Sequence, residues 1–168
     1  ELQLAQASAE RVISLLDEKS SIVDSPEVIA KYGTILEPKL DAYEPIIGDI
    51  EFKNIDFYYN IKEPILTDFN LKIKAGQTIA LVGETGSGKS TIVNMLCRFY
   101  EPIKGEILID GVDYRKRSIG WLHENLGYVL QSPHLFAGTI KDNIRYGKMD
   151  ATDEEIIAAA KYVNAHNF

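Results

Sequence analysis

The residues with the clearest chemistry are nine consecutive positions, Gly83-Glu84-Thr85-Gly86-Ser87-Gly88-Lys89-Ser90-Thr91. They fit the phosphate-binding pattern G-x-x-x-x-G-K-[ST] from Gly83 to Ser90. Glycines let the backbone reach positive φ and approach a ligand closely, so that successive N–H groups form a concave nest for phosphate oxygens. Lys89 adds a positive charge for the terminal phosphates, and the Ser90 hydroxyl is a suitable Mg²⁺ ligand. Glu84 and Thr85 contribute mainly their backbone. The pattern predicts a nucleoside triphosphate site.

The flanks of this loop have the order that such a site requires. Residues 78–82 are an apolar run of strand length that ends at Gly83, and residues 91–99 have the composition of a helix. A helix beginning there would point the positive end of its dipole at the phosphates. A Gly/Ser turn without function is the alternative, and the strand-loop-helix context disfavours it.

Composition places the chain among ordinary globular proteins and excludes several function classes. The 168 residues are 45% hydrophobic and 26% charged, enough for about one domain. A net charge of −7 gives no basic surface, so nucleic acid is not an expected partner. The single cysteine, Cys97, excludes an internal disulfide framework and a multi-thiolate metal site. We expect it to be a small buried apolar residue.

The first fifty residues read as a helix followed by a linker. Residues 2–18 repeat apolar positions three or four apart, which is typical of an amphipathic helix. Residues 24–48 contain three prolines and two glycines, which is linker composition. One helical turn is expected within it, at residues 26–31.

The next segments predict an antiparallel sheet that becomes α/β at the phosphate loop. Alternating apolar positions indicate strands over 50–59 and 66–74, with a turn at 60–64 and a slip in the alternation at Asn54. After the loop helix we expect a strand over 106–111 with a turn at Asp110 and Gly111, a short helix within 113–126 and a short strand over 128–131. Two more helices are predicted, one beginning at Thr139 with Asp142 in a weak capping box, and one over 152–164 capped by Thr152.

This order of elements resembles the ATP-binding cassette domains of ABC transporters, of the exporter type, over nearly the whole chain. The resemblance rests on the phosphate loop, on the strand that ends in an aromatic-x-tyrosine at Tyr59, and on residues 128–136, which resemble the family's glutamine loop. It implies an α/β fold, a P-loop NTPase core with an antiparallel β-subdomain. It also implies three segments: the helical end of a transmembrane-domain linker (1–20), the linker (21–48) and the N-terminal part of the nucleotide-binding domain (49–168).

The resemblance also implies roles for two residues outside the loop. Tyr59 would stack on adenine, because an aromatic face offers a stacking surface with little base selectivity. A one-residue slip would give this role to Tyr58, and an edge-strand tyrosine that only packs is the third possibility. Gln131 falls on the family's glutamine, whose amide oxygen can bind Mg²⁺ and hydrogen-bond the attacking water. ATP and Mg²⁺ are therefore the expected ligands, with Lys89 and Gln131 catalytic, Ser90 and Gln131 at the metal, and Tyr59 with residues 83–91 at the nucleotide.

The same resemblance predicts partners and a location. A second nucleotide-binding domain would pair with this one across ATP, and a transmembrane domain would dock near Gln131 and Phe136. The assembly would lie at the cytoplasmic face of the cell membrane.

Three family elements do not occur in these 168 residues: an LSGGQ-like signature, a later apolar strand ending in Asp-Glu, and the switch histidine. The resemblance thus implies an incomplete cassette that lacks its C-terminal half. We expect ATPase activity in the intact parent and none in the fragment. One alternative is a soluble P-loop kinase or ATPase that shares only the loop, which Tyr59 and Gln131 disfavour. The other is a module that binds nucleotide without turnover.

Overall fold

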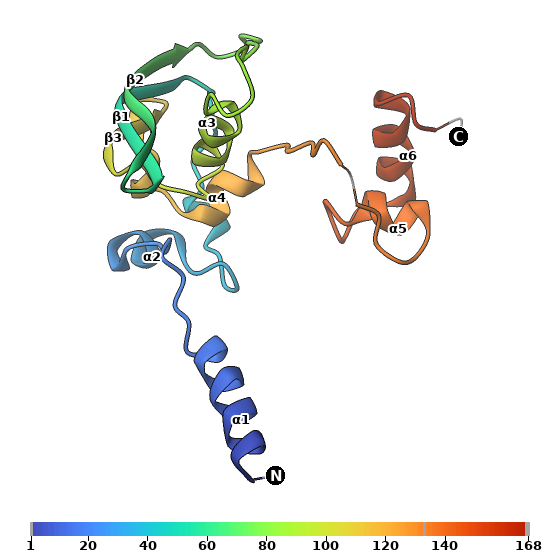
Figure 1. The fold of residues 1–168 in the computed structure, drawn as a ribbon. Helices are drawn as coiled ribbons and strands as arrows, with labels where there is room; N and C mark the ends of the chain where they lie inside the picture. The colour runs from blue at the N-terminus through green and yellow to red at the C-terminus, as the bar shows by residue number, and fades with distance from the viewer. Residues whose placement is uncertain (1, 133, 167–168) are drawn as a thin grey trace. The chain divides into compact units, whose positions relative to one another are not determined.

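The computed structural model describes residues 2–132 and 134–166. The chain divides into two compact units, Glu1–Gly127 and Tyr128–Phe168 (Figure 1). The first unit contains helices α1 (Leu2–Leu16), α2 (Pro26–Tyr32), α3 (Lys89–Leu96) and α4 (Ile119–Glu124), the 3-10 turns η1 (Leu40–Ala42) and η2 (Tyr114–Lys116), and strands β1 (Ile50–Asn60), β2 (Glu63–Ile73), β3 (Lys104–Ile109) and β4 (Val112–Asp113). The second contains α5 (Ile140–Arg145) and α6 (Asp153–Tyr162).

The sheet of the first unit is antiparallel throughout, with the strand order β2-β1-β3-β4. The predicted hairpin of β1 and β2 is confirmed. Asn54 takes a left-handed φ of 49°, and the pairing of β1 shifts register between Phe52 and Ile55, where the alternation slips in the sequence. The predicted turn after β3 is also confirmed, because Asp110 (φ 52°) and Gly111 (φ 76°) join β3 to β4.

The core of this unit lies between the sheet and the helices α3 and α4. Figure 1 shows α3 beside the sheet, and the buried cluster contains side chains from both layers. Its members include Phe52, Ile55 and Phe57 of β1, Ile92 and Met95 of α3, Ile107 and Ile109 of β3, and Trp121 and Leu122 of α4. Cys97, just after α3, is buried as expected. The burial of α3 fixes the start of this helix, and therefore the phosphate loop, relative to the sheet.

Residues 24–48 are attached to the rest of the first unit at a few points, although most of their side chains are exposed. Tyr32 of α2 is only 1% exposed, and the Trp121 indole Nε1 donates a hydrogen bond of 2.7 Å to the Glu44 carbonyl. The helical turn predicted at 26–31 is confirmed as α2, which has Ser25 as its N-cap. Several hydrogen bonds and buried side chains therefore hold this proline-rich segment in place.

A single carboxylate, Asp110, holds the end of the same segment. It accepts the N–H groups of Ile47, Gly48 and Asp49 at 2.8, 2.9 and 2.9 Å. Burial alone would raise the pKa of Asp110, but these donors outweigh it and hold that pKa below its usual range. The β3–β4 turn thus binds the residues that lead into β1.

Two predicted strands are absent from the described structure. Residues 78–82 and 128–131 have no regular secondary structure. A strand requires a hydrogen-bonded neighbour, and in the described ranges β1 to β4 pair only with one another. The apolar residues of these segments do have high β-propensity. In the described residues, however, no strand lies beside either segment to pair with it. The predictions of strands at these two places were wrong.

The second unit consists of two capped helices held together by ion pairs. Thr139 and Asp142 form a reciprocal capping box on α5, and Thr152 and Glu155 form another on α6. Asp153, at the start of α6, accepts from Lys141 Nζ at 2.6 Å and from an Arg145 guanidinium nitrogen at 3.0 Å, both on α5. Both helix starts were predicted and are confirmed.

The first helix, α1, is confirmed and ends at Leu16, two residues before the predicted end. No helix in the described part of the chain has the length and hydrophobicity needed to cross a bilayer.

Candidate nucleotide-binding site

The phosphate loop joins residue 82 to α3 through two left-handed glycines. Gly86 has φ 87°, and Gly88 has φ 88° and is the N-cap of α3. A Cβ on Gly88 would lie 3.2 Å from both Ile65 Cγ2 and Leu66 Cδ2. The loop therefore passes close to β2, and the left-handed backbone of position 88 favours glycine.

The Lys89 ammonium lies over its own loop. Its Nζ donates to the carbonyl oxygens of Gly83 at 2.8 Å and Glu84 at 2.6 Å, and lies 3.4 Å from Ser87 Oγ. The Ser87 N–H donates to the Glu84 carbonyl at 3.2 Å. These bonds close the loop into a compact turn with its positive charge at the N-terminal end of α3.

Tyr59, the residue predicted to stack on adenine, lies against the same helix. Its hydroxyl is 3.2 Å from the Oγ1 of Thr91, which is 5% exposed and follows Ser90. The Tyr59 ring packs edge-on against Phe57, with centroids 5.0 Å apart, and against Tyr100, with centroids 5.1 Å apart. Tyr59 as a whole is still 54% exposed. The structure thus brings the end of β1 together with the residues that follow the loop lysine.

Tyr58 is in a different environment. It is half-buried and pairs with Pro64 of β2. Tyr58 and Tyr59 both line the cavity beside Tyr100, and the pairing of β1 shifts register on either side of Tyr58. Tyr59 is the one that contacts α3, through Thr91.

These residues fit a magnesium-bound triphosphate. The left-handed glycines allow the loop backbone to approach a phosphate closely. Lys89 supplies the charge, and the exposed Ser90 hydroxyl is a hard oxygen of the kind that Mg²⁺ prefers. Tyr59 offers a partly exposed aromatic surface for a base.

Two predicted residues, Gln131 and Phe136, belong to the second unit. Gln131 is exposed. Phe136 stacks on Tyr146 with ring centroids 4.7 Å apart, and its backbone N–H and C=O are bonded by the Asn143 side-chain amide at 2.8 and 3.0 Å. Pro133, which lies between them in the predicted glutamine loop, is outside the described residues. The roles of Gln131 and Phe136 stay predictions.

Sequence reasoning missed the support of Tyr59. Thr91 was expected to be a nucleotide ligand, and Tyr100 had no expected role. No short sequence pattern indicates the contacts of Tyr59 with Thr91 and Tyr100, because these residues are far from Tyr59 in the chain. Tyr59 and Thr91, for example, are 32 positions apart. The aromatic pair at positions 99 and 100, directly after an amphipathic helix, is the only hint that the sequence offers.

Known proteins resemble this chain in sequence and in fold. A family model described as ABC transporter matches residues 66–168. The chain is 45% identical over 165 residues to "Uncharacterized ABC transporter ATP-binding protein YfiC" of Bacillus subtilis, covering 98% of this chain and 25% of that protein. It is 54% identical over 127 residues to "ABC transporter B family member 3" of Dictyostelium discoideum, covering 74% of this chain and 9% of that protein.

A solved structure agrees with these relatives. It is described as a bacterial Atm1-family ABC exporter with ATP bound, and it matches with a TM-score of 0.80 at 32% identity, covering 99% of this chain and 27% of the exporter chain. The chain therefore spans about a quarter of the length of this exporter and of the Bacillus relative.

Proposed function

Because this chain belongs to the ABC transporter family, as part of its ATP-binding domain, we propose that it binds MgATP and that the whole protein uses ATP hydrolysis to drive export across a membrane. The observation that carries this proposal is the phosphate loop at the start of α3, with the Lys89 ammonium held over it and Tyr59 bonded to the same helix. The similarity to exporters supports the direction of transport.

The roles proposed for the residues follow from their chemistry. The amides of residues 83–91 and Lys89 would bind the phosphate oxygens, and the Ser90 hydroxyl and the Gln131 amide oxygen would hold Mg²⁺. Mg²⁺ would neutralise part of the negative charge of the phosphates. Lys89 would stabilise the negative charge that develops during phosphoryl transfer, and Gln131 would orient the attacking water, since this reaction depends on positioning and charge stabilisation.

The partners proposed for the whole protein are a second nucleotide-binding domain and a transmembrane domain. The second nucleotide-binding domain would face this one, with ATP bound between them. The transmembrane domain would dock near Gln131 and Phe136, where exposed apolar side chains include Leu135 and Phe136. Such an assembly would place the chain at the cytoplasmic face of the cell membrane, with residues 1–20 and 21–48 leading from the membrane part to the nucleotide-binding domain over residues 49–168.

We also propose that the 168 residues alone do not hydrolyse ATP at a useful rate. They contain no apolar segment after Gln131 that ends in Asp-Glu, the pair that would orient the water and accept its proton. Gln131 alone leaves the nucleophile poorly positioned, and positioning accounts for much of the rate of such reactions.

A thermal melt with and without MgATP tests the binding proposal, because a ligand that binds only the folded state raises the midpoint. MgATP should raise the melting midpoint of the native chain and of Lys62→Ala, a matched control in the exposed β1–β2 turn, but not that of Lys89→Ala. Equal shifts in all three proteins, or none in any, would show that the loop is not the site. Phosphate release measured on the same samples should show no Lys89-dependent turnover.

A further inference from the structure

One buried side chain, Arg98, lies between the linker and the aromatic residues of the nucleotide site. It follows helix α3, is 4% exposed and has a left-handed backbone with φ 57°. A long side chain rarely adopts this conformation, so the surrounding contacts must determine it.

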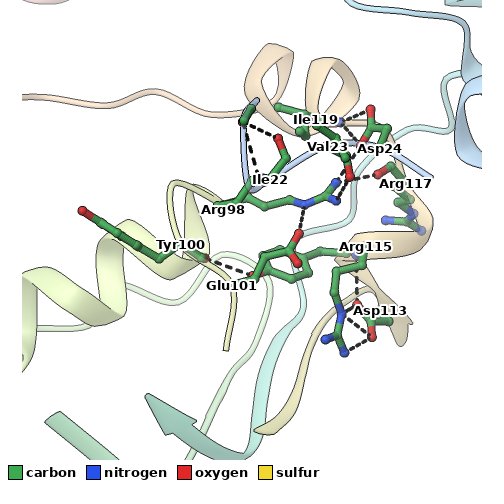
Figure 2. A network of polar contacts seen from close by, with 12 residues as sticks. Ile22, Val23, Asp24, Arg98, Tyr100, Glu101, Asp113, Arg115, Arg117 and Ile119 are labelled. Atoms are coloured by element: carbon green, nitrogen blue, oxygen red, sulfur yellow. Dashed lines mark hydrogen bonds and ion pairs between the residues drawn. The ribbon is translucent and has the colours of Figure 1, made fainter. Parts of the chain in front are cut away.

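The Arg98 guanidinium joins the linker to the main body of the first unit (Figure 2). Its Nη1 donates to Asp24 Oδ1 at 2.8 Å, and its Nε donates to Glu101 Oε1 at 2.8 Å. The Asp24 carboxylate also accepts the N–H of Ile119, the first residue of α4, at 3.0 Å. The linker thus has a buried ionic anchor directly behind the phosphate-loop helix.

The same network reaches Tyr100, which is the neighbour of Glu101. The Tyr114 hydroxyl donates to the Tyr100 carbonyl at 3.4 Å, and the Arg98 guanidinium lies 5.7 Å from the centroid of the Tyr114 ring. The Tyr100 ring in turn packs against Phe57 and Tyr59. Hydrogen bonds therefore run from Asp24 through Arg98 to Glu101, and Glu101 is the next residue in the chain after Tyr100, whose ring supports Tyr59.

The linker also comes near these rings directly. A cavity of about 400 Å³ is lined by Ser21 and Ile22 of the linker, by Tyr59 at the end of β1, and by Tyr100 and Glu101. A displacement of the linker would therefore change the lining of this cavity as well as the Asp24–Arg98 ion pair.

A role in stability alone is a weak explanation for the buried pair. Desolvation of two charges offsets most of their attraction, so an ion pair such as Asp24–Arg98 adds little stability compared with apolar residues. Its geometry is better explained by a role in orienting the two segments that it joins. A planar guanidinium bonded to the carboxylates of Asp24 and Glu101 fixes the position of both carboxylates relative to Arg98.

We propose that the Asp24–Arg98 ion pair is a positioning contact that holds Tyr100 against Tyr59, so that the position of the linker determines how well Tyr59 stacks on the bound base. This inference rests on the proposed function, since it assumes that Tyr59 binds the base of ATP. The linker then changes the affinity for ATP through the stacking of Tyr59 on the base. It does not change the contacts between the phosphate loop and the phosphates.

A double-mutant cycle on MgATP binding tests this inference, because it shows whether Asp24 acts through Tyr59. The dissociation constant is measured by calorimetry on the full chain for the native protein, Asp24→Asn, Tyr59→Ala and the double variant. We expect Asp24→Asn to raise the dissociation constant about tenfold, within the range for loss of one base stack. In the Tyr59→Ala background the same change should alter it less than about twofold.

Asp110→Asn is the matched control, because Asp110 also binds the linker to the main body of the first unit, at residues 47–49. It should leave the dissociation constant for MgATP unchanged. An equal loss in both aspartate variants, an Asp24→Asn effect that persists without Tyr59, or no Asp24→Asn effect at all would overturn the inference. Failure of the native chain to bind MgATP would instead overturn the proposed function.

If Asp24→Asn does not fold, Tyr100→Leu replaces it in the same cycle. Tyr100 is partly exposed and lies at the other end of the network. Its replacement should also weaken MgATP about tenfold, and only while Tyr59 is present. Full affinity in Tyr100→Leu, or a loss that persists in the Tyr59→Ala background, would contradict the proposed route through Tyr100.

Discussion

Tyr59 is held by three neighbours within the protein. Phe57 and Tyr100 contact its ring edge-on, and Thr91 bonds its hydroxyl. Ordering a side chain in advance reduces the entropy lost on binding. The same contacts connect the proposed base platform to the helix that carries Lys89, so one short segment of α3 would support both ends of the proposed nucleotide.

Replacement of Tyr59 by Ala should weaken MgATP binding by about 1–3 kcal/mol, the range for losing one base–aromatic stack. Tyr58→Ala is the matched comparison and should cost less, because Tyr59 is the tyrosine whose hydroxyl is bonded to Thr91 of α3. Calorimetric titrations of the two variants decide between them. A larger loss at position 58 would mean that the base stacks on Tyr58 instead.

The phosphate loop was predictable from sequence and the Arg98 network was not, for a physical reason. The loop is a local pattern, in which spacing along the chain fixes the backbone geometry and the chemistry together. Arg98 and Asp24 are 74 positions apart, and neither has neighbours of a distinctive type. Only the packing of the linker on α3 and α4 brings them into contact.

At the scale of elements, the linker has two anchors of different kinds. Near its start, Asp24 pairs with the buried Arg98, and near its end, Asp110 accepts three backbone N–H groups. Between them, Tyr32 and the Glu44 carbonyl contribute burial and a hydrogen bond to Trp121. A segment whose composition predicts a loose connection is thus fixed at both ends by carboxylates.

The Asp110 anchor should make stability depend on pH. Its pKa is lowered in the folded protein, so its contribution is present above the unfolded pKa of about 3.9 and is lost as the pH falls through the folded value. Asp110→Asn should lower the free energy of unfolding by about 2 kcal/mol at neutral pH, the range for hydrogen bonds to a charged group. The difference from the native chain should shrink below about pH 4.

Urea denaturation at a series of pH values measures this difference. Asp41→Asn, an exposed aspartate of the same linker, is the control and should follow the native curve. A constant gap between native and Asp110→Asn across the acid range would show that the charge of Asp110 does not matter.

Elements with local signals were predicted best. The helices α5 and α6 begin where Thr139 and Thr152 cap them, and each cap is completed by an acid three residues later. The segments 78–82 and 128–131 were predicted as strands from composition alone. A strand is completed by a neighbour that composition does not identify, and the described structure provides none for them.

At the scale of the whole molecule, the two compact units meet in sequence at residues 127 and 128. The residues that follow, including Val129, Leu130 and Leu135, are exposed and outside any helix or strand. Segments of this kind are the preferred sites of proteolytic cleavage.

Chymotrypsin at low concentration should therefore cut first in this segment, after Tyr128, Leu130, Leu135 or Phe136, all of which are exposed. Trp121 and Tyr114 provide internal controls, because both are fully buried side chains in folded parts of the first unit and should resist cleavage. Mass spectrometry of the early fragments identifies the bonds. Early cleavage after Trp121 or Tyr114 would contradict the division at residue 127.

The two segments that were wrongly predicted as strands also affect how the chain behaves in solution. Val82 is 92% exposed and Val129 is 93% exposed, each within an apolar run of high β-propensity. Such runs are templates for pairing between molecules, which leads to aggregation. The net charge of −7 opposes this association by mutual repulsion. Salt screens that repulsion, so the solubility of the isolated chain is expected to fall as the ionic strength rises.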